Sequence, residues 1–393
     1  MRRRETEISV PRLDKRRKKA YKHRKEVMAM LMDQTFKDDV LRFIDTNYMG
    51  LPGRYRYSAA SGEATLYSST YAAMTMSLFG KDIPDREEWA AYLCSYQEAD
   101  GLFRDPVIWG EGWYKNDALW CGRTHLTSHI LIALTCLGAV APRENTFLKP
   151  WEDTDYMISW LESRLWNCKG DISQTGNEIM NVGGLLQYER DFHGNDRAGK
   201  AVETMLEWLS CHHVDPATGL WGDDVDLNDP LQLSGVVQAA YHWWELFFYD
   251  GVPIPYPEQA AASILRTQNP LGGFGLGVHN RKEPFHSSAC EDIDSMSPLA
   301  RLYRLGIVKN DTVKEALLKG AQWVKSNQTP DGGLQFIKNR RFDYGHPQLA
   351  GPEDSGAMFP TWFRSLTLAL TASAFGDESL HFVRCPGMQF DVG

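Results

Sequence analysis

The sequence predicts an all-α fold, an α6/α6 toroid (barrel) in which inner and outer helices alternate. A turn containing glycine followed by an aromatic or apolar residue recurs at intervals of about 50 to 70 residues. Apolar and amphipathic helical segments alternate between these turns, and strand signals are sparse. Because one such hairpin cannot bury its apolar helix alone, we expect the repeats to close into a ring.

The repeated turn has four clear copies, and each follows an amphipathic segment with a charged face. The copies lie at residues 97–103, 215–221, 268–274 and 328–334, and a weaker copy lies at 160–170. The preceding segments, such as 86–96, 201–209 and 312–326, have the pattern of helices that cover a buried layer. They are the predicted outer helices.

More apolar segments follow the turns and are the predicted inner helices. They span residues 64–79, 125–137, 178–188, 231–248, 294–305 and 358–374. In such a barrel the turns that lead into the inner helices deliver side chains to one mouth, where helix N-termini add positive potential. We therefore expect a central cavity at that mouth.

Composition limits the possible classes of protein. The chain has 393 residues and 43% hydrophobic content, enough for one large core, so we predict a basic leader over residues 1–25 and a single toroid domain over 26–393. Seven cysteines without paired spacing indicate reduced thiols and a cytoplasmic setting. A net charge of -9 argues against nucleic-acid binding, and no apolar run is long enough to span a membrane. Peripheral contact of the basic leader with an anionic membrane is the alternative to a solvated leader.

The turns at residues 97–103 and 328–334 carry the pattern Gln-x-x-x-Gly-x-aromatic or apolar. This pattern resembles the QW-type repeats of the squalene cyclase and protein prenyltransferase superfamily, over about residues 60 to 375. The resemblance implies an α/α toroid.

Three acids and a thiol lie together where the fifth inner helix begins: Cys290, Glu291, Asp292 and Asp294. Carboxylates packed this closely repel one another, so at least one is expected to have a raised pKa. The Asp-Ile-Asp sequence resembles the Asp-x-Asp-Asp motif of class II terpene cyclases. That resemblance implies Asp294 as the proton donor and Asp292 as its helper, with Ser295 in place of the third acid. Capping of the helix by Glu291 and Asp292 is the structural alternative.

A metal site is a second interpretation of the same segment. Cys290, Asp292 and His346 offer the thiolate, carboxylate and imidazole that zinc accepts. The set resembles the zinc ligands of protein prenyltransferases, although cysteine here precedes the acid. The prediction is therefore no obligatory cofactor, with zinc or magnesium as the alternative.

Aromatic and histidine side chains are the predicted substrate-binding residues. His125 and His129 are four residues apart and share one helix face. His242, next to two tryptophans, is predicted to be a core or wall residue. The predicted binding set comprises Tyr67, Trp113, Trp120, His125, His129, Trp243, His286, Tyr344 and Trp362.

Four functions remain open from the sequence. The first is acid-initiated cyclisation or isomerisation of an isoprenoid, with Asp294 as acid, tuned by Asp292 and Glu291. The second is a carbohydrate-active hydrolase, lyase or epimerase that uses paired acids or His346 with Tyr344. The third is zinc-dependent prenyl transfer, and the fourth is a binding module in which the carboxylates only cap helices. The expected partner is a small molecule, isoprenoid or sugar-like.

Overall fold

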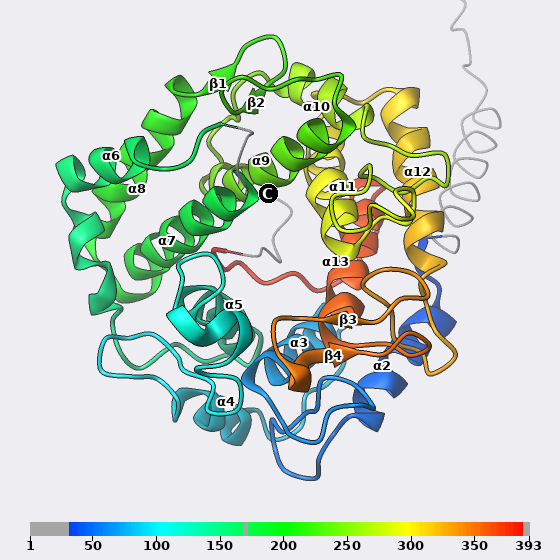
Figure 1. The fold of residues 1–393 in the computed structure, drawn as a ribbon. Helices are drawn as coiled ribbons and strands as arrows, with labels where there is room; N and C mark the ends of the chain where they lie inside the picture. The colour runs from blue at the N-terminus through cyan, green and yellow to red at the C-terminus, as the bar shows by residue number, and fades with distance from the viewer. Residues whose placement is uncertain (1–30, 168–171, 388–393) are drawn as a thin grey trace, which may run out of the picture.

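A computed structural model describes residues 31–167 and 172–387. The predicted basic leader, residues 1–25, and part of the weak repeat at 160–170 lie outside the described residues. Within the described part, helices dominate and the strands are short (Figure 1). None of these helices is both long and apolar enough to cross a membrane.

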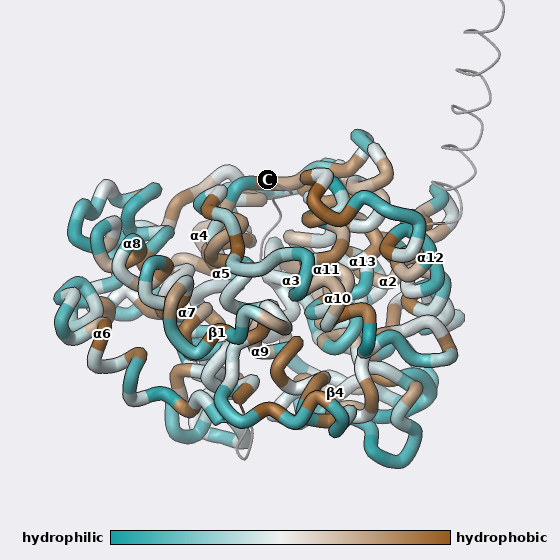
Figure 2. The backbone as a smooth tube through the Cα atoms, turned by 90° about the horizontal axis from the view of Figure 1, so that it is seen from above, coloured by the Kyte–Doolittle hydropathy of each residue, from teal (hydrophilic) through white to brown (hydrophobic). Residues whose placement is uncertain are grey.

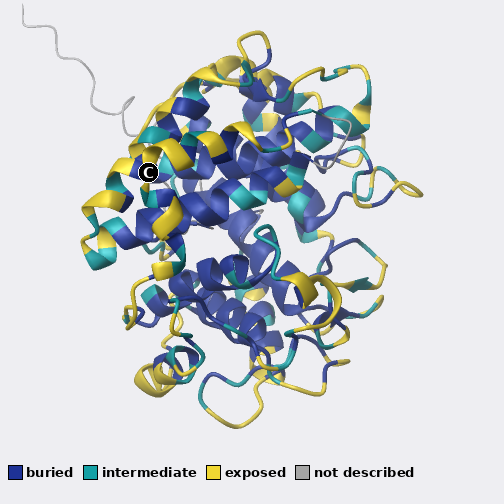
Figure 3. Cartoon of the chain, turned by 60° about the vertical axis from the view of Figure 1, so that its left-hand side comes forward, coloured by how far each residue is buried: buried dark blue, intermediate teal, exposed yellow. Residues whose placement is uncertain are grey.

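A closed ring of inner helices forms the centre of the molecule, as predicted. Each helix packs on the next, and the last packs on the first (Figure 1). These helices are buried on nearly all sides, which explains why their sequences lack a polar face (Figure 3). They are α3 (Leu66–Leu78), α5 (Arg123–Cys136), α7 (Ile172–His193), α9 (Pro230–Asp250), α11 (Ala289–Arg304) and α13 (Met358–Ala374).

The outer helices surround this ring, and the α6/α6 prediction is confirmed. They bury one face against the inner helices and expose the other, and hydrophilic residues are frequent along the periphery (Figure 2). They are α2 (Gln34–Thr46), α4 (Arg86–Cys94), α6 (Thr154–Glu162), α8 (Asp196–Cys211), α10 (Pro257–Leu265) and α12 (Asp311–Lys325).

The glutamine of the repeated turn joins neighbouring repeats. Gln97 Nε2 donates to the carbonyl oxygens of Gly101 in its own turn and Arg143 in the next repeat, both at 2.8 Å. Gln268 Nε2 likewise donates to Gly272, at 2.9 Å, and to Ala316 in α12, at 2.8 Å. The repeated residue is therefore a hydrogen-bonding link along the outer ring.

The glycine of the last repeat closes the outer ring. Gly332 has φ +95°, and a Cβ built there would lie 2.2 Å from the carbonyl oxygen of Asp39 in α2. Only glycine allows this backbone conformation and this close approach at once. The seam between the end of the repeats and α2 depends on it.

Short irregular elements complete the ring. Strand β1 (Val214–Asp215) pairs with β2 (Leu220–Trp221), and β3 (Phe342–Asp343) pairs with β4 (Ala350–Gly351), both antiparallel. Short 3₁₀ helices are η1 (Gly112–Asn116), η2 (Thr146–Glu152) and η3 (Pro347–Leu349).

The segment after α13 crosses the end of the ring at which the inner helices finish. His381 N donates to Leu78 O at 3.0 Å, and Arg384 donates to Tyr249 O at 2.8 Å. Cys385 is fully buried, and Gly387 lies against Ser128. The segment therefore covers the face opposite to the inner-helix N-termini.

Replacing the closing glycine should weaken the ring. We expect Gly332→Ala to lower the free energy of unfolding by about 2 kcal/mol or more, because the side chain adds both backbone strain and a clash with α2. Gly306→Ala is the matched control: its φ is +85°, but a Cβ there meets nothing within 4 Å. That control should lose only about 1 kcal/mol of strain. Urea denaturation measures the free energy of unfolding of both variants. If both lost the same amount, the contact between Gly332 and α2 would not stabilise the ring.

Candidate active site at the mouth of the barrel

A cavity of about 290 Å³ lies at the mouth formed by the N-terminal halves of the inner helices. All six inner helices contribute to its wall, so turns far apart in sequence do meet around one hollow. The lining residues are Tyr67, Trp113, Tyr114, Trp120, Cys121, His125, Ser173, Gln174, Asn177, Gln238, His242, His279, Cys290, Asp294, Phe336, Phe342, Tyr344, Phe359 and Phe363.

Asp294 is the one acid in this lining. Its side chain is 98% buried on α11, and within the described residues it makes no hydrogen bond. Burial, and then the negative charges of Glu291, Glu245 and Asp292, raise the pKa of this carboxyl well above its usual value. The surroundings of Asp294 therefore favour its protonated form, which could donate a proton into the cavity.

Two histidines in the same wall are neutral. His242 Nδ1 lies 2.7 Å from the carbonyl oxygen of Gln238. Because a carbonyl only accepts, Nδ1 carries the hydrogen and Nε2 keeps its lone pair. Burial lowers the pKa of His242 to about 4. His125 lies 2.7 Å from the Tyr67 hydroxyl, and burial, together with His129 and His242, lowers its pKa well below the usual value.

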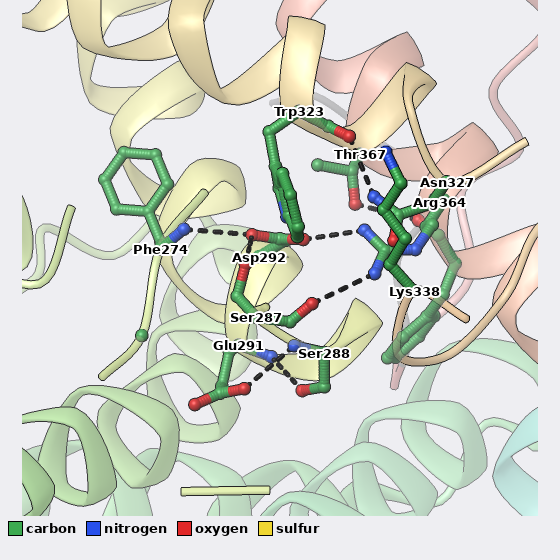
Figure 4. A network of polar contacts seen from close by, with 12 residues as sticks. Phe274, Ser287, Ser288, Glu291, Asp292, Trp323, Asn327, Lys338, Arg364 and Thr367 are labelled. Carbon is green, nitrogen blue, oxygen red and sulfur yellow. Dashed lines mark hydrogen bonds and ion pairs between the residues drawn. The ribbon is translucent and has the colours of Figure 1, made fainter. Parts of the chain in front are cut away.

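Asp292 does not line the cavity but lies in a buried network of polar contacts (Figure 4). Its Oδ1 accepts from Phe274 N at 2.9 Å and Ser287 Oγ at 2.8 Å. Its Oδ2 accepts from Trp323 Nε1 at 3.0 Å and from Arg364 at 2.6 Å. Four donors occupy the acceptor positions of one carboxylate, so Asp292 joins α11 to α12, α13 and the preceding turn.

Glu291 caps its own helix. It forms a capping box with Ser288, and its other oxygen accepts from Val278 N at 3.0 Å. Burial alone would raise the pKa of Glu291, but the nearby His279 and the hydrogen bonds at Ser288 lower it below the usual value. The capping interpretation therefore holds for Glu291, and the three neighbouring acids have three different surroundings.

Two loops meet over the mouth. Trp113 N in η1 donates to Gly345 O in the β3–β4 hairpin at 3.2 Å, and the Tyr114 hydroxyl donates to Tyr344 O at 2.9 Å. The Trp113 and Tyr344 rings are 5.6 Å apart, edge to face. His346 Nε2 lies 3.1 Å from Glu111 Oε2, which ties the same two loops. We name residues 110–122 and 342–351 the mouth loops.

The structure places half of the predicted site residues on the cavity wall. On the wall are Tyr67, Trp113, Trp120, His125, Cys290, Asp294 and Tyr344. Behind the wall or beside it are His129, Trp243, His286, Glu291, Asp292, His346 and Trp362. Trp243 packs on Trp166 and Trp221, and Trp362 packs on Tyr71.

Sequence reasoning missed part of the lining. His242, predicted as core or wall, presents a free ring nitrogen, and Gln238 one turn earlier lines the same cavity. The spacing of four residues on an apolar helix was the signal for this polar pair. His279, in the loop before α11, gave no pattern that would distinguish it.

The predicted zinc ligands are not brought together. Cys290 lines the cavity, Asp292 is engaged by Arg364, and His346 belongs to the mouth loops. Among the described residues, no group of three His, Cys, Asp or Glu side chains is placed to hold a metal ion. The residues therefore do not fit a zinc or magnesium centre of that composition.

The sequence matches no protein-family model and no curated protein. Solved structures do share the fold. A polysaccharide lyase has a TM-score of 0.50 at 12% identity, over 90% of this chain and 97% of its own. An α-1,6-mannanase from Salegentibacter has a TM-score of 0.48 at 13% identity, over 87% of this chain and 99% of its own. A family 88 glycosyl hydrolase from Bacteroides vulgatus has a TM-score of 0.47 at 12% identity, over 87% of this chain and 98% of its own.

The chain has the α/α toroid fold. The resemblance to squalene cyclases and prenyltransferases implied this fold correctly. At 12% identity the likeness to the polysaccharide lyase is one of fold alone, and the narrower assignment to the squalene cyclase superfamily is not shown.

Two neighbouring acids should respond oppositely to neutralisation. We expect Asp292→Asn to lower the free energy of unfolding by about 3–5 kcal/mol, because it leaves the Arg364 guanidinium buried without a counter-charge. The free energy of unfolding of Asp294→Asn should exceed that of wild type by an amount that grows as pH rises. The raised pKa of Asp294 means that the folded state holds a proton that the unfolded state releases above about pH 4, so wild type loses stability with pH.

The measurement is urea denaturation of both variants at pH 5, 6, 7 and 8. The stability gap between Asp294→Asn and wild type should widen with pH by up to about 1.4 kcal/mol per pH unit, until the raised pKa is passed. A gap that stays constant over this range would show that Asp294 is ionised in the folded protein.

Proposed function

We propose that this protein is a carbohydrate-active enzyme that uses Asp294 as general acid and a neutral histidine, His242 or His125, as general base. The observation that supports it is one cavity lined by a buried carboxyl of raised pKa and by two buried imidazoles of lowered pKa. General acid–base catalysis needs a donor and an acceptor that are both in the right state near the working pH. These pKa shifts supply both.

The lining favours a sugar over an isoprenoid. Trp113, Trp120 and Tyr344 offer ring faces at the mouth, where the apolar face of a sugar can stack. Gln174, Asn177 and Gln238 bring amide groups into the wall, which match hydroxyl groups. A hydrocarbon chain would leave the buried Gln238 Nε2 without an acceptor, at a cost of about 1–3 kcal/mol. A polysaccharide lyase uses the same fold.

The number of carboxyl groups in the described wall favours proton transfer at carbon over hydrolysis by a pair of carboxyl groups. Glycosidases of the common kind place two carboxyl groups on either side of the bond to be cleaved. Asp294 is the sole carboxyl among the described lining residues, and Glu245 beneath it is engaged by Arg301 and Ser297. An acid and a base in one cavity suit a lyase or an epimerase, in which the base removes a C–H proton and the acid protonates an oxygen.

Acid-initiated isoprenoid cyclisation is the second candidate. It would use the same Asp294, whose pKa is raised and which shares the cavity wall with the aromatic rings of Phe359 and Phe363. The helper role implied for Asp292 is harder to reconcile with a carboxylate whose oxygens already accept four hydrogen bonds.

Turnover should depend on both groups and should follow their titration. Activity needs Asp294 protonated, so it should fall as pH rises through its raised pKa. It needs His242 unprotonated, so it should fall as pH decreases through about 4. We expect Asp294→Asn and His242→Gln each to lower kcat by about 10²- to 10⁴-fold.

The measurement is proton NMR in D₂O with a panel of sugars and oligosaccharides, since proton removal at carbon introduces deuterium. Cys290→Ser, which also lines the cavity, is the control and should keep most activity. Cyclised products from isoprenoid diphosphates that disappear in Asp294→Asn would overturn the proposal in favour of the second candidate. Sugar binding without any exchange would indicate a binding module.

A further inference from the structure

The described cavity wall contains no lysine and no arginine. The arginines nearest to the ring interior already have carboxylate partners. Arg364 pairs with Asp292 at 2.6 Å, Arg301 with Glu245 at 3.3 Å, and Arg123 with Asp117 at 2.8 Å. Among the described lining residues, therefore, no lysine or arginine side chain faces a carboxylate, sulfate or phosphate on a ligand.

Gln238 offers a different kind of group. Its side chain is 96% buried, lines the cavity, and has an Nε2 without a hydrogen-bond partner within the described residues. A buried amide donor without a partner is unfavourable unless a ligand oxygen accepts from it. The main-chain carbonyl oxygen of Gln238 also accepts from His242 Nδ1, so Gln238 lies next to the candidate base.

We propose that the substrate is an uncharged reducing sugar, that Gln238 donates to one of its oxygens, and that the reaction is epimerisation or aldose–ketose isomerisation. This inference rests on the proposed function and narrows it. A cavity of about 290 Å³ is at the small end for ligand sites, which agrees with a small sugar and not with a long polymer segment.

The lack of a cationic side chain in the described wall favours one of the two proton-transfer reactions over the other. In a lyase that acts on uronates, the electron pair of the broken C–H bond moves into the sugar carboxylate, and that growing negative charge needs a cation or strong donors. Transfer of a carboxylate from water into a wall without a cation is costly. An uncharged sugar avoids this cost.

In an uncharged sugar, the acidic C–H bond is the one beside the carbonyl of the open-chain form. His242 Nε2 takes the C2 proton, and the C–H electron pair forms the C1–C2 double bond. The carbonyl π pair moves onto oxygen, which takes the proton of Asp294, so a neutral enediol results. To give the epimer, the C1 hydroxyl returns its proton to the Asp294 carboxylate as the C1 carbonyl re-forms, the C1–C2 π pair takes a proton from water on the other face of C2, and the resulting hydroxide takes the proton from His242. To give the ketose, the C2 hydroxyl gives its proton to Asp294 as the C2 carbonyl forms, and the π pair takes the proton of His242 at C1. Atoms and electrons balance without a co-reactant.

The test compares matched uncharged and acidic sugars at pH 7.5. Glucose, mannose and N-acetylglucosamine are each incubated with the full chain in D₂O, beside glucuronate, mannuronate and their oligosaccharides. The expected result is deuterium at C2 and an isomeric product from at least one uncharged sugar. The uronates should inhibit at least about tenfold more weakly than the uncharged substrate, because nothing in the wall neutralises them.

The role of Gln238 is tested by Gln238→Met, which keeps the length of the side chain and removes the donor. KM should rise by about 3- to 10-fold, the effect of one neutral hydrogen bond. The melting temperature should stay the same or rise, because the variant also removes an unpaired buried donor. A lower melting temperature with unchanged KM would overturn the recognition role.

Failure of this inference and failure of the proposed function give different results. An unsaturated product from a uronate oligosaccharide, lost in Asp294→Asn, would overturn the uncharged-sugar inference and leave the acid–base enzyme intact. Turnover of an isoprenoid, with no exchange in any sugar, would overturn both.

Discussion

The buried ion pair between Asp292 and Arg364 is the interaction on which the rest of the site depends. Both side chains are fully buried, and their closest atoms are 2.6 Å apart. Arg364 also donates to the carbonyl oxygens of Gln335 and Phe336, in the last repeat turn, and of Ser287, just before α11. One guanidinium thereby fixes the start of α11 relative to α13. That start carries Cys290 and Asp294 into the cavity.

Helix geometry explains why three adjacent acids serve different purposes. Residues four apart lie on one face of a helix, so Cys290 and Asp294 share the face toward the cavity. Asp292 is two positions from each and points to the opposite side, where Trp323 and Arg364 meet it. Glu291 lies in the first turn, where free amide groups need acceptors. A cluster that looks uniform in sequence becomes a cap, an anchor and an acid.

Much of the fold could be predicted from the sequence, because the repeated turn and the alternation of helix types are local patterns. Gln97 and Gln268 hold successive repeats by the same pair of hydrogen bonds, so the repetition had a physical cause that sequence comparison within the chain could find. The rotation of each inner helix about its own axis was not accessible in this way. An inner helix is buried on nearly all sides, so no solvent-exposed polar face shows which side meets the cavity.

Because the rotation of the inner helices could not be predicted, only some of the site residues could be found from the sequence. Asp294, His125 and Tyr67 lie near helix starts, which the turns locate, and all three line the cavity. Trp243 and His242 are adjacent in the middle of α9, where one position of rotation separates the wall from the core. The arrangement puts the histidine on the wall and the tryptophan behind it. Only contacts between distant helices determine that choice.

The segment after α13 gives the barrel a closed floor. Because the described part of this segment lies across the ends of α3 and α9, it obstructs the axis of the ring on that side. In the enzyme proposed above, reactant and product would then share the entrance beneath Trp113 and Tyr344. If the mouth loops had to open for each exchange, their opening would set the upper limit on turnover.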